Sequence, residues 1–126
     1  VAQIYFLQKR YEELIEKAVP WYDNASAKQK PEMARLIGES YFELHEFEKA
    51  LEYLGFYFSN SSGFSRKDNY AYAYTLYQTG KFESALKKFN LVINKEDELA
   101  QIALFNMGDC YLKTNNLTSA QSAFSR

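Results

Sequence analysis

Hydrophobic residues in this chain recur with the period of an α-helix, and the helical stretches come in pairs. One stretch places apolar or small side chains at i, i+3, i+4 and i+7, which is one face of a helix. That face consists of Ala34, Ile37, Gly38 and Tyr41. A second stretch has a similar face, formed by Phe47, Ala50, Leu51 and Leu54. The pattern predicts two antiparallel helices that share a core, and no segment has the alternation of a strand.

The same phrase occurs three times at a fixed interval of 35 residues: FEKALEYL at 47–54, FESALKKF at 82–89 and LTSAQSAF at 117–124. Other positions align at this interval, among them a small-residue column of Gly38, Ala73 and Gly108 and a turn column of His45, Gly80 and Asn115. Glycine, asparagine and, less readily, histidine tolerate the left-handed backbone of a tight turn. We therefore expect a repeated helix–turn–helix unit, whose copies stack to bury faces that one pair cannot bury alone.

This column pattern resembles the tetratricopeptide repeat (TPR) family over nearly the whole chain. The resemblance implies an all-α fold, a right-handed α-solenoid of antiparallel helix–turn–helix repeats. We expect a single TPR domain over residues 1–126, with a partial repeat at 1–30, repeats at 31–65 and 66–100, and a truncated repeat at 101–126. The partial repeat departs from the family pattern. Leu14 stands where a small alanine belongs, and Pro20 predicts a kink or an early helix end.

Residues with capping chemistry indicate where several helices begin. Pro31 suits the first turn of a helix. Ser65 with Asp68 has the spacing of a capping box, and Asp97 can cap a later helix. The segment 59–63, which reads SNSSG, predicts a flexible connector between two repeats.

Composition is typical of a globular helical protein and argues against several kinds of partner. Hydrophobic residues make up 47% and charged residues 25% of the 126 residues. The net charge of -1 provides no field that would attract nucleic acid, so no nucleic-acid partner is expected. No apolar run approaches the roughly 20 residues of a membrane span. The single cysteine, Cys110, excludes an internal disulfide.

Both ends of the chain stop within a helical pattern, which indicates a piece of a longer protein. The first residues form part of a hairpin without an upstream neighbour, and they include Val1, Ile4 and Tyr5. At the other end, apolar surface is expected to be exposed by Ala120, Ala123 and Phe124. Solenoids need polar capping units, so self-association through the truncated ends is predicted.

No group of residues has the pattern of a catalytic, cofactor or metal site. His45, the only histidine, falls in the turn column and is interpreted as structural. Cys110 lies on the face of a first helix and is interpreted as a small buried hydrophobe. The sequence has no CxxC, no HExxH and no Gly-rich phosphate loop. We therefore predict no enzyme activity, no cofactor and no metal.

A second, partly aromatic face lies one residue on from the core face, about 100° around each first helix. In the TPR family the first helices line a concave groove, and these columns contact the ligand. Carried over residue by residue, the resemblance implies a partner-binding set of aromatic residues with polar residues beside them. The set consists of Phe6, Arg35, Glu39, Phe42, Tyr70, Tyr74, Tyr77, Phe105, Asn106, Asp109 and Leu112. The other interpretation is that these aromatic residues only pack between adjacent first helices.

The predicted function is protein–protein interaction, with a peptide or protein segment bound in the aromatic-lined concave groove. The family's carboxylate clamp for acidic C-terminal peptides needs Asn in a column that Glu39, Tyr74 and Asp109 occupy here, so that ligand is not expected. Two alternatives stay open: a spacer or self-association segment of a longer solenoid, and a helical accessory domain of an enzyme. The texture of residues 98–124 is similar to TPR proteins of bacterial envelopes, which favours the periplasm, with the cytoplasm as the alternative.

Overall fold

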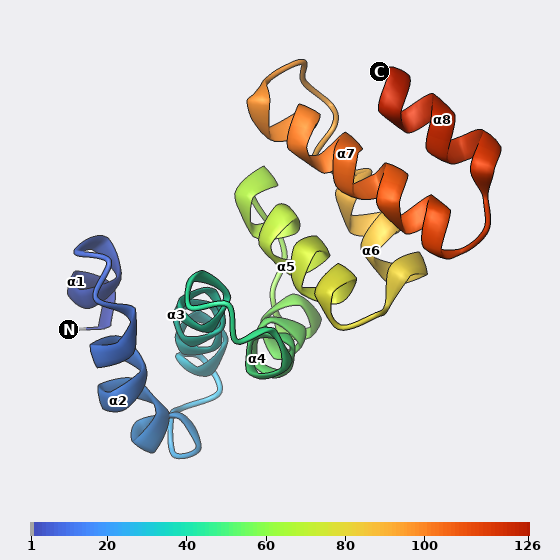
Figure 1. Ribbon diagram of the computed structural model, residues 1–126. Coiled ribbons are helices and arrows are strands. Elements are labelled where there is room, and N and C mark those ends of the chain that lie inside the picture. Colours follow the sequence, from blue (N-terminus) through green and yellow to red (C-terminus); the bar gives the residue numbers. More distant parts are fainter. Residues whose placement is uncertain (1) are drawn as a thin grey trace. The chain divides into compact units, whose positions relative to one another are not determined.

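The computed structural model describes residues 2–126, which form helices and connecting segments without a β-strand (Figure 1). The prediction of an all-α fold is therefore confirmed. The helices group into two compact units, Val1–Gly63 and Phe64–Arg126. Val1 itself, which the sequence analysis places in the first hairpin, lies outside the described residues. Each unit contains two helical hairpins and is described by itself.

The first unit consists of four helices that pack in chain order. Their bounds are α1 Ala2–Leu7, α2 Tyr11–Tyr22, α3 Lys30–Glu43 and α4 Phe47–Asn60. Helices α1 and α2 form the first hairpin and α3 and α4 the second, while α3 also contacts both α1 and α2. The buried core includes Leu14, Ala34, Ile37, Ala50 and Leu54. The predicted core face of α3 is confirmed, because all four of its members are buried.

The second unit repeats this arrangement with four more helices. Their bounds are α5 Arg66–Gln78, α6 Phe82–Phe89, α7 Glu98–Lys113 and α8 Leu117–Ser125. The hairpins are α5 with α6 and α7 with α8, and α7 contacts both α5 and α6. The buried core includes Ala73, Ala85, Phe89, Val92, Ala103 and Cys110. The prediction that Cys110 is a buried free thiol is confirmed.

All four hairpins turn through three residues, one of which has a left-handed backbone. The angle φ is 58° at Lys9, 61° at His45, 81° at Gly80 and 61° at Asn115. Backbone N–H groups then bond back into the preceding helix, as at His45, which donates to the Phe42 carbonyl at 3.0 Å. This closure satisfies carbonyls that the helix end would otherwise leave without partners. The predicted turn column is confirmed, and Lys9 joins it.

The predicted helix starts are confirmed by their hydrogen bonds. The Asp68 backbone N–H donates to the Ser65 hydroxyl at 3.0 Å, and the Asp68 carboxylate accepts from the Ser65 N–H at 3.4 Å, which completes a capping box. Asp97 accepts from the Ala100 N–H at 3.0 Å and caps α7. Pro31 lies in the first turn of α3. Helix α2 continues through Pro20 and ends at Tyr22, so the expected early end comes just after the proline.

Small residues in the first helices allow the second helix of the same hairpin to approach closely. A Cβ atom added at Gly38 would lie 2.9 Å from Cγ of Leu54, and one added at Gly108 would lie 2.3 Å from Cε1 of Phe124. Real Cβ atoms do not approach their neighbours this closely, so an alanine at either position would force Leu54 or Phe124 to shift. The predicted small-residue column is therefore a packing contact.

In α2, the sizes of two core positions are exchanged relative to the other second helices. The other pairs place alanine first and a large residue four positions later: Ala50 and Leu54, Ala85 and Phe89, Ala120 and Phe124. Helix α2 instead places Leu14 first and Ala18 four positions later, and both are buried. The departure noted at Leu14 is thus matched by a smaller partner, which keeps the combined side-chain volume similar.

One expectation for the end of the chain is wrong in part. Ala120 and Ala123 do not expose apolar surface, because both are buried in the hairpin of α7 and α8. Phe124 does, with 46% of its surface exposed, and at the other end Ile4 is 58% exposed. Among the described residues no helix has both the length and the apolar character needed to cross a bilayer.

Candidate partner-binding surface

The eleven predicted partner-binding residues divide between the two units. The first unit holds Phe6, Arg35, Glu39 and Phe42 on α1 and α3. The second unit holds Tyr70, Tyr74, Tyr77, Phe105, Asn106, Asp109 and Leu112 on α5 and α7. Each set comes from helices that contact one another within their unit. Both sets are therefore local surfaces with their own geometry.

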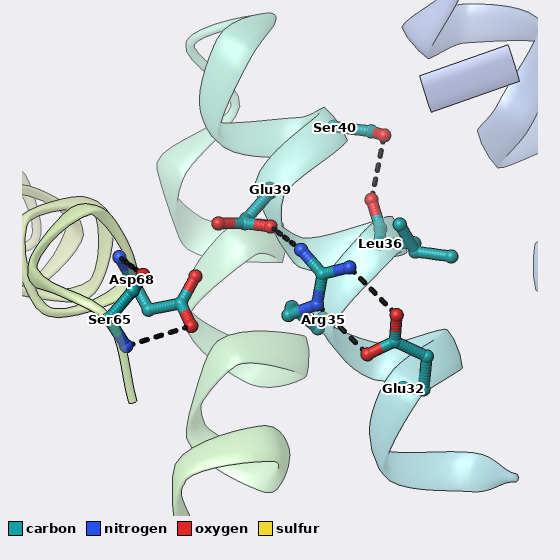
Figure 2. Close-up of polar contacts among 7 residues, drawn as sticks. All are labelled: Glu32, Arg35, Leu36, Glu39, Ser40, Ser65 and Asp68. Carbon is teal, nitrogen blue, oxygen red and sulfur yellow. Dashed lines mark hydrogen bonds and ion pairs between the residues drawn. The ribbon is translucent and has the colours of Figure 1, made fainter. Parts of the chain in front are cut away.

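In the first unit, Arg35 is held between two carboxylates of its own helix, as Figure 2 shows. Its guanidinium nitrogens lie 2.7 Å from Glu32 and 2.8 Å from Glu39. These pairs have the i,i+3 and i,i+4 spacing that brings side chains together on a helix. The guanidinium carbon also lies 5.8 Å from the centre of the Phe6 ring on α1, which is a cation–π contact. The two ion pairs thus stabilise α3, and the cation–π contact links α1 to α3.

Phe42, at the other end of α3, belongs to the hairpin turn as much as to the surface. Its ring meets Phe47 of α4 edge to face at 6.1 Å, and Phe47 stacks on His45 at 5.6 Å. Phe42 is half-buried, while His45 is exposed. The lone histidine therefore packs on an aromatic ring in the turn, in agreement with the structural role predicted for it.

In the second unit, three tyrosines follow one face of α5, and we call Tyr70, Tyr74 and Tyr77 the tyrosine ladder. The ring centres of Tyr70 and Tyr74 are 5.9 Å apart with nearly parallel planes, and those of Tyr74 and Tyr77 are 5.7 Å apart. All three residues are half-buried. The spacing i, i+4, i+7 places them along one stripe of the helix.

Hydrogen bonds fix the ladder to α7 and to its own helix. The Asn106 amide donates to the Tyr70 hydroxyl at 3.1 Å, and the Tyr77 hydroxyl donates to the Asp109 carboxylate. The Gln78 amide donates to the Tyr74 hydroxyl at 2.8 Å. Tyr70 and Tyr77 therefore do pack between adjacent first helices, as the alternative interpretation expected, although their rings keep some exposure.

The α7 residues of the set differ widely in exposure. Phe105 is 66% exposed and Leu112 is 42% exposed, whereas Asn106 is only 7% exposed. Phe105 touches Phe124 of α8, with ring centres 5.7 Å apart. Asn106 therefore positions Tyr70 from within the unit. Phe105 and Leu112 are the apolar members that a partner could reach.

Two members of the ladder, Tyr70 and Tyr77, present neutral hydroxyl groups at ordinary pH. Burial and the hydrogen bond to Asp109 raise the pKa of Tyr77 well above its usual value. Burial also raises the pKa of Tyr70, and the bond from Asn106 opposes this rise. Burial raises the pKa of the Cys110 thiol to about 11, so it is a poor nucleophile. Among the described residues, no group of three or more His, Cys, Asp or Glu side chains is placed to hold a metal ion.

The predicted set omits three residues that complete these networks. Gln78 holds Tyr74, Lys113 lies 3.6 Å from Asp109, and Glu32 pairs with Arg35. Each lies three or four positions from its partner on the same helix, so i,i+3 and i,i+4 pairing could have identified it. The bonds from Tyr70 to Asn106 and from Tyr77 to Asp109 join residues 36 and 32 positions apart, and they depend on how α5 packs against α7.

Comparisons with known proteins agree with the repeat architecture. The model of the tetratricopeptide repeat family matches residues 102–126. No match to a curated protein was found. A crystal structure of the C-terminal part of a TPR repeat-containing protein from Cytophaga hutchinsonii is similar, with a TM-score of 0.58 and 18% sequence identity.

That similarity covers 98% of this chain and 61% of the other, so the present chain spans less than two thirds of its relative. At this identity the likeness shows the fold, which is the fold of a helical-repeat protein. The predicted resemblance to proteins of bacterial envelopes finds no support in either match.

Proposed function

We propose that this chain, whose residues 102–126 match the tetratricopeptide repeat family, is a protein-interaction module that binds a peptide or protein segment. The proposal rests on the surface of the second unit formed by the tyrosine ladder with Phe105 and Leu112. Phe105 and Leu112 are 66% and 42% exposed, on a helix that contacts the ladder's own helix. Exposed apolar patches next to polar groups commonly mark binding sites on soluble proteins.

The chemistry of this surface suits a binding partner. Tyrosine is large, has few rotatable bonds and carries a polar tip, so it contributes contact area at low entropic cost. The bonds from Asn106 and to Asp109 hold two of the rings before any partner arrives. Such preorganisation lowers the ordering cost of association. In the first unit, Phe6, Arg35, Glu39 and Phe42 form a more polar surface that we assign to the same role.

Selection from a displayed library of random peptides, followed by affinity measurement on the whole 126-residue chain, tests the proposal. Tyr74→Ala and Phe105→Ala are each expected to weaken a selected peptide by at least about 2 kcal/mol, the usual loss at an interface hot spot. Trp21→Ala is the matched control, since Trp21 is 72% exposed on α2 and lies outside both sets. Equal affinity of all three variants, or a selection that yields no peptide, would contradict the proposal.

A structural spacer is the second candidate, because Tyr70 and Tyr77 tie α5 to α7. Thermal melts separate the two functions. For a binding surface, Phe105→Ala should change the free energy of unfolding by no more than about 0.5 kcal/mol, as expected for an exposed position. For a spacer whose aromatic residues serve packing, truncation of the half-buried Tyr74 should cost about 3–5 kcal/mol, the range for core aromatics.

A further inference from the structure

We infer that α7 and α8 together form a docking surface for an amphipathic helix of a partner protein. The surface consists of Phe105 and Leu112 on α7 with Leu117 and Phe124 on α8, and we call it the helix seat. The inference goes beyond the proposed function, because the helix seat shares two residues with the surface described above and extends it onto α8. It also specifies the polarity of two side chains of the partner.

The helix seat repeats a surface that the second unit covers with a helix of its own. Each residue of the helix seat lies 35 positions after a residue of the hairpin formed by α5 and α6. The equivalents are, in order, Tyr70, Tyr77, Phe82 and Phe89. Helix α7 contacts both α5 and α6, and it lies between their hairpin and α8 (Figure 1). The hairpin of α5 and α6 therefore shows how a helix packs on these four positions.

The aromatic pair of the helix seat has the same geometry as its equivalent but not the same burial. The rings of Tyr70 and Phe89 have centres 5.8 Å apart and planes at 59°. Those of Phe105 and Phe124 have centres 5.7 Å apart and planes at 58°. Under α7, Phe89 is 0% exposed, whereas Phe124 is 46% exposed. The second ring pair is thus built like the first and lacks the cover that α7 gives.

The two remaining positions show the same difference. Tyr77 and Phe82 meet edge to face at 6.1 Å, and both are half-buried. Leu112 and Leu117 occupy the equivalent positions and are 42% and 63% exposed. Four large apolar side chains from two packed helices are therefore open to solvent where the preceding hairpin has them covered. An exposed apolar patch of this kind marks an interaction site on a soluble protein.

Helix α7 indicates which segment fits such a surface. Its Asn106 side chain donates to the Tyr70 hydroxyl, and its Asp109 carboxylate accepts from the Tyr77 hydroxyl. These two side chains lie three positions apart, so they project from neighbouring turns of one helix. Helix α7 thus supplies one polar partner for each of the two tyrosine hydroxyls.

The helix seat has no hydroxyl at either position, because Phe105 and Leu112 replace Tyr70 and Tyr77. An amide or a carboxylate packed against them would lose water without gaining a hydrogen bond, which is costly. The partner helix should therefore carry apolar residues at two positions three apart, where α7 has polar ones. Amphipathic helices use this i,i+3 spacing for the residues that anchor them in apolar grooves.

A second copy of this chain is a poorer occupant than a separate protein. Its own first helices α3, α5 and α7 are already packed in their hairpins, so they cannot lie on the helix seat of another molecule. A free amphipathic segment of a partner has no such prior contact. We therefore assign the helix seat to a helix of a partner protein.

Two peptides based on α7, Glu98–Lys113, test the inference by fluorescence anisotropy with the whole 126-residue chain. One peptide carries Asn106→Leu and Asp109→Leu, and the other keeps both polar residues. Both carry Cys110→Ala, which prevents disulfide formation. We expect saturable binding of the leucine peptide and at least about tenfold weaker binding of the polar one, because its amide and carboxylate would be buried without partners.

Variants of the chain show whether the leucine peptide binds at the helix seat. Leu117→Ala and Phe105→Ala should each weaken it at least about tenfold, as at an interface hot spot. Leu91→Ala is the matched control, since this leucine is 50% exposed in the same unit and lies outside the helix seat. Circular dichroism checks that each variant is folded, and two independent variants keep the test decisive if one fails to fold. Binding equal to the parent's by both would overturn the inference.

Equal affinity of the two peptides, or no saturable binding of either, would also overturn the inference. Sedimentation velocity of the chain alone tests the other occupant: a dimer that Leu117→Ala disperses would assign the surface to a second copy and contradict the inference. The proposed function is judged separately. It stands if the random-library selection yields a peptide whose binding depends on Tyr74, and it falls if that selection yields none.

Discussion

The two units share their backbone plan and differ in what their polar side chains connect. In the first unit, the carboxylates that pair with Arg35 belong to the same helix, so these ion pairs stabilise α3 itself. In the second unit, Tyr70 and Tyr77 bond to residues of α7, so the corresponding face of α5 joins two helices. The repeat thus preserves apolar packing and turns, while the columns outside the core take a different chemistry in each copy.

The first way to test this comparison is to transfer the exchanged core pair of α2 into α4. Leu54→Ala alone should cost about 2–5 kcal/mol of unfolding free energy, because it leaves a cavity. Ala50→Leu alone should cost about 1–3 kcal/mol, because both positions are buried and a larger side chain overfills the contact. The double variant reproduces the order of Leu14 and Ala18, so its cost should be smaller than the sum by about 1 kcal/mol or more.

Denaturant unfolding of both single variants and of the double variant measures this coupling. Glu48→Gln, at an exposed position of the same helix, is the control and should unfold like the parent. If the two single effects simply add, the exchange in α2 is not a compensated pair.

The second test compares the two glycine contacts. The methyl of Gly38→Ala would meet buried Leu54 at Cγ and at its backbone nitrogen, 2.9 Å and 3.0 Å away, and neither can swing aside. We expect a loss of about 1–2 kcal/mol, since overpacking outweighs the better helix propensity of alanine. The methyl of Gly108→Ala would meet the Phe124 ring, which is 46% exposed and can move into solvent.

Gly108→Ala should therefore change stability by less than about 1 kcal/mol, although its contact distance is shorter. Thermal melts of the two variants under one condition decide the order. A larger loss for Gly108→Ala would show that α8 holds Phe124 as firmly as α4 holds Leu54.

The third test addresses the bond that joins α5 to α7. Tyr77→Phe removes the hydroxyl that donates to Asp109 and should cost about 1 kcal/mol at neutral pH. The folded pKa of Tyr77 lies above its unfolded value of about 10. The stability that the Tyr77 hydroxyl contributes is therefore fully present below about pH 10 and is lost as the pH rises through the folded pKa.

Melting temperatures of parent and Tyr77→Phe, measured from pH 7 to pH 11, follow this decline. The difference in melting temperature between parent and Tyr77→Phe should narrow above about pH 10. Burial also raises the pKa of Tyr72, which both proteins retain, so their shared alkaline loss cancels in the comparison. A difference that stayed constant over this range would exclude the hydroxyl as its source.

The smallest expected effect concerns the start of α7. Arg66 donates to Asp97 at 2.7 Å, and this bond, followed by the bond from the Ala100 N–H, holds the pKa of the Asp97 carboxyl well below its usual range. The stability that the Asp97 carboxylate contributes is present above about pH 4 and is lost as the pH falls through the folded pKa. The corresponding helix of the first unit, α3, has no side-chain cap bond at Gln29.

Asp97→Asn retains a capping side chain and loses the charge. Its melting temperature should therefore be slightly lower than the parent's at pH 7, and this difference should begin to narrow as the pH falls below about 4. The side chain is 42% exposed, so added salt should also narrow the difference. Glu98→Gln, beside it in the first turn, is the control. An unchanged difference at low pH would show that the ion pair with Arg66 does not stabilise the folded chain.

Features fixed by local chemistry could be predicted from the sequence. Ser65 with Asp68 and Asp97 have side chains that cap helices wherever the backbone permits, and both caps form as expected. The turn at His45, Gly80 and Asn115 follows from residues that accept a left-handed backbone. Lys9 was missed because lysine carries no such signal. Its turn also lies 36 residues before His45, outside the 35-residue interval.

The candidate surface was predictable as a set of columns but not as a network. The columns place Tyr77 and Asp109 on their helices, yet nothing in the sequence states that the hydroxyl reaches the carboxylate across α5 and α7. Exposure was equally hidden, since neighbouring Phe105 and Asn106 are 66% and 7% exposed. Such differences depend on the rotation of one helix against the next, which is set by the packing of the whole unit.

The constant three-residue turns have a consequence for how such a chain can change in length. All four hairpins keep this turn, whereas the connectors between hairpins are 23–29, 61–65 and 90–97. The extra residue between the turns at Lys9 and His45 leaves both turns and both buried second-helix positions, Leu14 and Ala50, intact. This extra residue is thus accommodated outside the turns and the buried contacts of the hairpins, which makes the hairpin the unit that recombination could exchange.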